Sequence, residues 1–316
     1  MKYKYFFNIA DVCMQVTSDS LHERNPDWDW KLESFILKES DRVDTEFKLK
    51  LTDRFVKHKP HILFETRRTD YVPSPTTTRC REMADAYLGV GVDWRVGEYD
   101  GRLLFEGGGA SCFQLSMDKD LRGADINLIK NGGRWELSDL VYSFMQLYMI
   151  FFLGRHQLGL MFHAAGVRDD GENGQGLLFA GSSGAGKTTA AKIWHKYGCT
   201  KVLNDDRIII RKVDGDYYMY STPWHGDYYQ YFNRPLGKSR VDKMFCLYHR
   251  ETNKAMKLTP REGFTMFFKT IFPLFYDKES MEFSSKFLLD LVAAVPSYSF
   301  GFKNDSGIMD YVRKIQ

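Results

Sequence analysis

The first part of the chain contains short strand-like runs rich in apolar residues, separated by many turn signals. Such runs occur at residues 3–9, 35–37, 47–51, 61–65, 103–105 and 111–116. The sequences Val-Pro-Ser-Pro at 72–75 and Gly-Gly-Gly at 107–109 are typical of turns. This pattern predicts a β-rich accessory or substrate region over residues 1–133.

A long apolar helix is expected next, as a connecting segment over residues 134–158. Ser138 and Asp139 are suitable N-cap residues, and the apolar pattern then continues to about Arg155. The apolar part is shorter than the roughly 20 residues that a bilayer requires, so the sequence predicts a buried helix and no membrane span.

From Gly159 the pattern changes to strand, turn, strand, glycine-rich loop, helix and strand. The apolar run at 176–180 is bounded by glycines, and the segment 189–197 contains strong helix formers and ends before Gly198. Further strands are expected at 243–248 and 298–302, with helices opening at Pro260 and covering 277–295. The sequence thus predicts an α/β domain over residues 159–316.

The glycine-rich loop matches the phosphate-binding motif G-x-x-x-x-G-K-[S/T]. In this motif, glycines allow backbone N–H groups to point at phosphate oxygens, a lysine reaches the β and γ phosphates, and a hydroxyl ligates Mg²⁺. Because a strand precedes the loop and a helix follows it, the motif has the context it needs. The predicted ATP-binding residues are Gly181, Ser182, Ser183, Gly184, Ala185, Gly186, Lys187, Thr188 and Thr189.

Two adjacent carboxylates, Asp205 and Asp206, end the next apolar run, 18 residues beyond Lys187. Adjacent side chains of an extended segment diverge, so one can face a metal or water while the other faces a nucleophile. The alternative is that Asn204 and the two aspartates only start a turn, where these residue types are common.

The residues after the aspartates predict a β-hairpin. Two apolar runs, 207–213 and 217–220, flank an Asp-Gly pair at 214–215. In many small-molecule kinases with a phosphate-binding loop, a helix follows the acid at this point. The sheet is therefore expected to be partly antiparallel near the site.

His163 precedes the loop, and the polar stretch 168–175 predicts a hairpin turn. A turn centred near residues 171 and 172 places His163 opposite about Ala180, at the mouth of the loop. The side chain would there reach the carboxylates or the γ-phosphate. The alternative is a packed, hydrogen-bonded histidine without a functional role.

The segment 222–234 is rich in aromatic residues, with His225, Asp227 and Arg234 among them. It is interpreted either as an acceptor-binding lid, in which Arg234 stabilises the transferring phosphoryl group, or as a packed surface loop.

The amino-acid composition argues against several classes of protein. A net charge of +3, with 44 basic and 41 acidic residues, does not favour nucleic-acid binding. The five cysteines are widely spaced without a C-x-x-C pair, so neither a disulfide framework nor a zinc site is expected, and a reducing cytoplasm fits best.

Four motifs together resemble the catalytic domain of HPr serine kinase/phosphorylase. They are His-Ala-Ala-Gly from 163, the loop from 181 to 188, Asn-Asp-Asp from 204 and Thr-Pro-Trp from 222, and the likeness covers about residues 155–302. Relatives include kinases of lasso-peptide biosynthesis and, more distantly, ATP-dependent phosphoenolpyruvate carboxykinases. The arginine-containing segment linked to phosphorolysis, the N-terminal domain of those enzymes and the carboxykinases' oxaloacetate-binding pattern are not recognised. The resemblance implies a mixed sheet of the HPr kinase type, and hexameric relatives suggest a homo-oligomer.

The resemblance also implies roles for residues. Lys187 and Thr188 would hold ATP and Mg²⁺, one aspartate of the pair would be the catalytic base and the other would lie near the metal. We assign Thr188 and Asp206 to the metal while leaving open which aspartate is the base. His163 would orient or tune that carboxylate.

These observations predict a cytoplasmic, ATP- and Mg²⁺-dependent kinase that phosphorylates a hydroxyl, such as a serine of a peptide or protein, or a small molecule. Two alternatives stay open. One is a nucleotide-gated binding or scaffold module without phosphoryl transfer, and the other is a slow ATPase.

Overall fold

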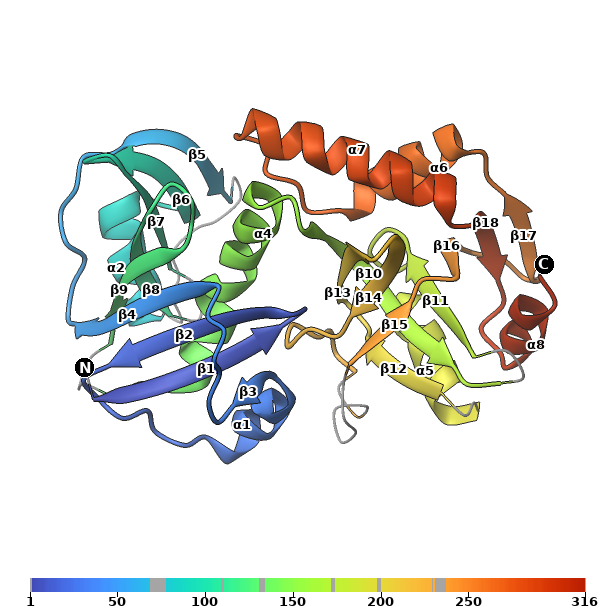
Figure 1. Cartoon of the computed structure of the whole chain (residues 1–316), viewed down its shortest axis with the longest axis horizontal. Helices are drawn as coiled ribbons and strands as arrows, with labels where there is room; N and C mark the ends of the chain where they lie inside the picture. The colour runs from blue at the N-terminus through green and yellow to red at the C-terminus, as the bar shows by residue number, and fades with distance from the viewer. Residues whose placement is uncertain are drawn as a thin grey trace. The chain divides into compact units, whose positions relative to one another are not determined.

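The chain forms two compact units, Met1–Phe152 and Leu153–Gln316. The computed structural model describes residues 2–68, 78–108, 111–130, 134–171, 174–197, 200–228, 230 and 237–315. Each unit contains a large mixed β-sheet with helices, so the protein is mixed α/β (Figure 1). The boundary falls inside the expected connecting segment 134–158, which is therefore divided between the two units.

The first unit, coloured blue to green in Figure 1, is built on a nine-stranded sheet with the order β3-β1-β2-β4-β9-β8-β7-β6-β5. The pairs β2/β4 and β4/β9 are parallel and the others antiparallel. Its strands are β1 (Tyr3–Ile9), β2 (Val12–Ser18), β3 (Ile36–Leu37), β4 (Thr45–Thr52), β5 (His61–Arg67), β6 (Val92–Tyr99), β7 (Arg102–Gly108), β8 (Cys112–Met117) and β9 (Gly123–Ile129). Its helical segments are α1 (Pro26–Leu32), η1 (Glu33–Phe35), α2 (Arg79–Leu88), α3 (Leu137–Leu140), the π-helical turn η2 (Val141–Met145) and α4 (Gln146–Arg155), which crosses the boundary.

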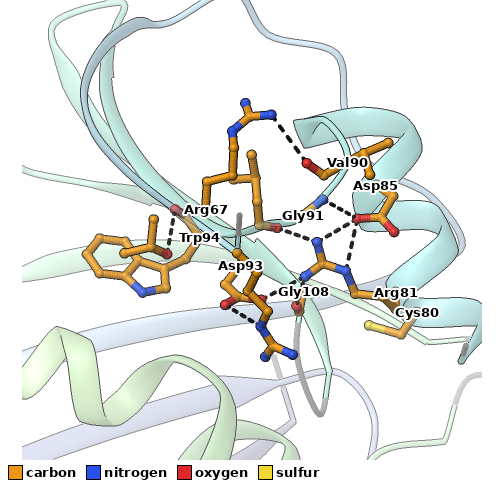
Figure 2. Close-up of polar contacts among 12 residues, drawn as sticks. Arg67, Cys80, Arg81, Asp85, Val90, Gly91, Asp93, Trp94 and Gly108 are labelled. Atoms are coloured by element: carbon orange, nitrogen blue, oxygen red, sulfur yellow. Dashed lines mark hydrogen bonds and ion pairs between the residues drawn. The ribbon is translucent and has the colours of Figure 1, made fainter. Parts of the chain in front are cut away.

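Helix α2 is held on this sheet by a buried arginine. The Arg81 guanidinium donates to Asp85 within the helix and to Asp93 on β6, and also to the carbonyls of Val92 and Gly108 (Figure 2). The Arg81 and Asp85 side chains are only 10% and 9% exposed. A buried carboxylate is tolerated only when it is paired, so this arginine compensates the charges that face it.

We expect Arg81→Met to destabilise the first unit by about 3 kcal/mol, because it leaves Asp85 buried without its cation. Arg67→Met is the matched control: Arg67 is 51% exposed and pairs with Glu65 at the surface, so its loss should cost no more than about 0.5 kcal/mol. Urea unfolding of the full chain, followed by a probe in the first unit, measures both. Equal stability of the two variants would contradict this account.

Cys80 of α2 and Cys112 of β8 are paired in a disulfide. The expectation of no disulfide is therefore wrong at this position. The two cysteines are 32 residues apart, and they meet only because α2 packs on the sheet, which spacing along the chain does not reveal. Disulfides are characteristic of oxidising compartments, so this pair argues against a reducing environment.

Among the described residues, one helical stretch, Leu137–Arg155, is long and apolar enough to cross a membrane by length and composition. Of its apolar window, 72% is buried inside the protein, as in a core helix. Its N-terminus differs in detail from the expectation, because Glu136 is the N-cap and exchanges capping-box hydrogen bonds with Asp139.

The second unit is built on a sheet with the order β15-β14-β13-β10-β11-β16-β18-β17, in which β12 also pairs with β10. Its strands are β10 (Gly159–Asp169), β11 (Gln175–Ala180), β12 (Thr200–Asn204), β13 (Arg207–Val213), β14 (Asp216–Tyr220), β15 (Lys238–Arg240), β16 (Lys243–His249), β17 (Lys254–Lys257) and β18 (Ser297–Phe302). Its helices are α5 (Lys187–Tyr197), α6 (Pro260–Phe267), η4 (Phe268–Thr270), α7 (Lys278–Ala294) and α8 (Gly307–Arg313).

Helices cover both faces of this sheet (Figure 1). Alternate residues of β11 show the two faces: Phe179 packs against Trp194 of α5, whereas Leu178 belongs to the core that includes Phe287 and Leu291 of α7. The result is a three-layer arrangement with α5 on one side and α6 and α7 on the other.

The pairing of the strands confirms the predicted mixture of directions. β11, β16 and β18 are parallel, whereas β10, β13 and β14 are antiparallel. The predicted hairpin is confirmed as β13 and β14 joined at Asp214-Gly215. The β10/β11 hairpin is also confirmed, with Ala164 rather than His163 opposite Ala180.

Candidate functional site

The glycine-rich loop, residues 181–186, connects the end of β11 to the start of α5. Gly186 has φ +101°, and a Cβ at this position would lie 2.5 Å from Cζ of Phe302. Glycine is therefore required by both backbone conformation and space. The N-terminus of α5 opens at this loop. The N–H groups of a helix's first turn have no partner within the helix and favour an anion there.

Lys187, the first residue of α5, points back into the loop. Its Nζ donates to the carbonyl oxygens of Gly181 at 3.0 Å and Ser182 at 2.9 Å. The residue is buried, and this burial lowers the pKa of the ammonium, while the charge of Asp206 acts in the opposite direction. The loop thus encloses a cation that faces the nearby carboxylate.

The two aspartates lie where the chain passes from β12 to β13. Both strands pair with β10, β12 with its second half and β13 with its first half. Asn204, which is fully buried, accepts from the N–H groups of Asp206 and Arg207 and donates to the carbonyl of Thr222 at 2.9 Å. This turn fixes the backbone of the aspartate pair, so the turn and the functional interpretation of the sequence are compatible.

Asp205 faces the start of α5. Its Oδ2 accepts from the Thr188 hydroxyl at 3.2 Å, and its Oδ1 accepts from the backbone N–H of Gly226 at 2.9 Å. A Cβ at Gly226 would lie 2.7 Å from Oδ2 of Asp205, so the 222–228 segment approaches the carboxylate closely. Asp205, rather than Asp206, is therefore the aspartate beside the predicted metal-binding hydroxyl.

Asp206 lies between two basic side chains. His163 Nε2 donates to its Oδ1 at 3.0 Å, and Arg207 Nη1 to its Oδ2 at 2.7 Å. His163 and Arg207 are directly paired residues of β10 and β13. The Phe272 ring lies near both, 4.8 Å from the Arg207 guanidinium and 6.5 Å from the His163 ring. The structure thus brings the predicted histidine and aspartate together and adds an arginine.

These contacts set the charge state of Asp206. Burial on its own would raise the pKa of this carboxyl, but the hydrogen bond from His163 and the charges of Arg207, His163 and Lys187 outweigh it, so the pKa is lowered. Asp206 is therefore ionised at neutral pH. Its ionised form stabilises the folded protein above the unfolded-state pKa near 4, and this stabilisation is lost as the pH falls through the lower folded-state pKa.

We expect Arg207→Met to shift the titration profile of the Asp206 carboxyl to higher pH, because it removes one of the charges that lower its pKa. Arg207→Lys keeps the charge and should give a profile closer to that of the wild type. Arg211→Met, on the same strand, is the control. Carboxyl titration followed by carbon-13 NMR from about pH 2 to pH 8 tests this, and a midpoint unchanged in Arg207→Met would contradict it.

The aromatic segment after the hairpin is described in part. Asp227 lines the same cavity as the loop, His225 Nδ1 donates to the carbonyl of Gly226, and the Tyr228 hydroxyl contacts His195 of α5. Arg234 lies outside the described residues, so its predicted role has no structural counterpart here.

A cavity of about 340 Å³ lies between the glycine-rich loop and Asp206. It is lined by His163, Ser183, Gly184, Gly186, Lys187, Thr188, Thr189, Asp206, Gly226 and Asp227. Two larger cavities of this unit, about 460 and 480 Å³, lie near Arg313 and Arg240 and lack residues of the glycine-rich loop. Of these three cavities in the described part of the unit, the 340 Å³ cavity is lined by the glycine-rich loop together with Lys187 and Asp206.

The donor set suits Mg²⁺ better than a transition metal. No group of three or more His, Cys, Asp or Glu side chains that could hold a metal occurs in the part of the chain that the structure describes. Thr188 and Asp205 offer one hydroxyl and one carboxylate, and Mg²⁺ typically takes one or two carboxylates and completes its shell with substrate phosphates and water.

Two residues of the site were not predicted. Arg207 follows the aspartates directly, and its position after them was a signal that sequence reasoning could have used. His249 ends β16 and contacts Gly184, but it lies 62 residues beyond Lys187 in the sequence, and only the pairing of β11 with β16 brings it close.

No protein-family model matches this chain, and no curated protein matches its sequence. The function is therefore inferred from the residues of the site.

Proposed function

We propose that this protein is an ATP- and Mg²⁺-dependent kinase that transfers the γ-phosphoryl group to a hydroxyl of a peptide, a protein or a small molecule. The observation that carries the proposal is the division of the aspartate pair: Asp205 contacts Thr188, while Asp206 contacts His163 and Arg207. Phosphoryl transfer requires a phosphate-binding loop, a carboxylate close to the metal ion and a separate ionised carboxylate close to the acceptor.

In this proposal Asp206 is the base. The acceptor oxygen forms a bond to the γ-phosphorus, the bond from that phosphorus to the bridging oxygen breaks, ADP leaves, and Asp206 takes the hydroxyl proton. Lys187 and the backbone N–H groups of the loop stabilise the negative charge that develops on the phosphoryl oxygens. His163 and Arg207 keep the carboxylate ionised and oriented.

Thr188 and Asp205 would hold Mg²⁺, which supplies neutralisation of phosphate charge when bound. This assignment differs from the sequence-based one, which paired Thr188 with Asp206. The reason is the 3.2 Å contact from the Thr188 hydroxyl to Asp205.

The arrangement also supports the resemblance to the HPr kinase type of fold as a proposal. The expected elements follow one another along the chain and belong to one sheet and its connections. They are the strand that carries His163, the loop that precedes Lys187, and the aspartate pair followed by a hairpin. A cytoplasmic location remains part of this proposal, with the Cys80–Cys112 disulfide as the feature against it.

Phosphorus-31 NMR of a reaction with MgATP and a pool of host peptides, proteins and metabolites tests the function. A phosphate-ester resonance that grows as ADP accumulates supports the kinase. Inorganic phosphate as the sole product identifies an ATPase, and bound but unconverted ATP identifies a nucleotide-gated binding module.

A further inference from the structure

His249 contacts the glycine-rich loop from a strand that the proposed chemistry does not use. Its ring is exposed, and its Nε2 lies 2.6 Å from the carbonyl oxygen of Gly184. Because a carbonyl only accepts, Nε2 carries the hydrogen and donates it.

The strand order places His249 and the aspartate pair on opposite sides of the loop. On one side of β11 lies β10, which pairs with β12 and β13, the strands joined by the aspartate turn. On the other side lie β16 and β18, both parallel to β11. Ligands of open α/β sheets bind beyond the carboxyl ends of parallel strands, and His249 is the carboxyl-terminal residue of β16.

The polarity of the site determines the direction in which a nucleotide extends. The phosphates of the nucleotide that bind the metal would lie at Thr188, next to Asp205. The nucleoside must then leave the loop on the side away from these carboxylates, over the ends of β16 and β18. Phe302, the last residue of β18, packs under the loop at Gly186, and its ring centroid is 6.2 Å from that of His249.

We propose that His249 forms the nucleoside subsite of the ATP site. The imidazole ring packs against the nucleoside, and its Nε2–H holds the loop at Gly184. This inference rests on the proposed function, because it assumes that the loop binds the phosphates of a nucleotide. It adds a residue that recognises the part of ATP that does not react.

Calorimetric binding of MgATP and of magnesium tripolyphosphate to the full chain tests this subsite. His249→Ala should weaken ATP binding about tenfold, the usual scale for loss of an aromatic ring under a base, and change tripolyphosphate binding less than about twofold. Lys187→Ala, in contrast, should weaken both ligands. Since His249 is exposed, the alanine variant is expected to fold normally.

Two further variants separate the ring from its hydrogen bond. His249→Phe keeps an aromatic face without the donor and should retain most ATP affinity, whereas His249→Gln keeps a donor without the ring and should behave like alanine. Equal weakening of both ligands in His249→Ala, or no weakening, would overturn the subsite.

Calorimetry combined with the phosphorus-31 NMR transfer assay distinguishes the two proposals. If the wild-type protein binds ATP but transfers no phosphoryl group, the kinase proposal is refuted. The ATP and tripolyphosphate affinities of the His249 variants then still decide whether the nucleoside subsite exists. Wild-type protein that binds neither ligand would refute both.

Discussion

Replacing Lys187 with alanine should reduce phosphoryl transfer by about a thousandfold or more, the largest loss expected of any single substitution in this protein. The lysine is the cation enclosed by the glycine-rich loop, with its Nζ held by the carbonyls of Gly181 and Ser182. In the proposed function, its removal takes away the charge that would balance the β and γ phosphates. Affinity for MgATP should also fall, by about ten- to a hundredfold, as expected for lost charge-assisted hydrogen bonds.

The matched control is Lys196→Ala, in the last turn of the same helix. Lys196 is exposed and lies beside Tyr197, far along α5 from the loop. This variant should bind and transfer as the wild type does. Steady-state kinetics and calorimetry on both variants, with circular dichroism as a check of folding, make the comparison. Wild-type transfer by Lys187→Ala would rule out the loop as the phosphate site.

The second large effect is expected at the aspartate pair, where the two asparagine variants should differ in kind. Asp206→Asn should lower kcat by about a hundredfold or more, the scale of a lost general base, while MgATP affinity changes less than about threefold. Asp205→Asn should instead raise the Mg²⁺ concentration required for half-maximal rate by about tenfold, because Asp205 is the carboxylate that contacts Thr188.

Both substitutions preserve shape, so the turn made by Asn204 should persist in each. Titration of Mg²⁺ at saturating ATP separates the two effects. A metal requirement raised by Asp206→Asn and unchanged by Asp205→Asn would reverse the assignment and restore the pairing of Thr188 with Asp206 that the sequence alone suggested.

The local features of the second unit were predictable because they depend on neighbouring residues. The Asp-Gly pair at 214–215 specifies a tight hairpin turn, and Thr259 before Pro260 specifies the start of α6, where the structure shows a capping box with Glu262. The glycine-rich loop likewise has its strand and helix on either side in the sequence.

In the first unit, prediction was less complete. Each of the six expected runs overlaps a strand, but β2, β6 and β9 and the helices α1 and α2 were not predicted. Arg81 of α2 shows why: its partners include Asp93 on β6, and the helix is stabilised by this contact with the sheet. Tertiary contacts of this kind override local propensity and leave little trace in a single sequence.

The candidate site could be predicted where its members are close in sequence or joined by a hairpin. Asp205 and Asp206 are adjacent, and the β10/β11 turn placed His163 within one residue of its observed register. The roles of the two aspartates could not be separated, because the divergence of their side chains depends on the Asn204 turn and on Thr188 and Arg207. His249 could not be predicted because it reaches the loop only through the pairing of β11 with β16.

The most direct test of the proposed kinase is the fate of the γ-phosphoryl group in single-turnover reactions of wild type and Asp206→Asn. ATP labelled in the γ-phosphate is incubated with Mg²⁺, the protein and fractionated host peptides, proteins and metabolites. The proposal predicts label in an acceptor as a phosphate ester with the wild type, and transfer slowed about a hundredfold with Asp206→Asn at unchanged ATP binding. Label that stays in bound ATP, or that appears only as inorganic phosphate with every fraction, would contradict it.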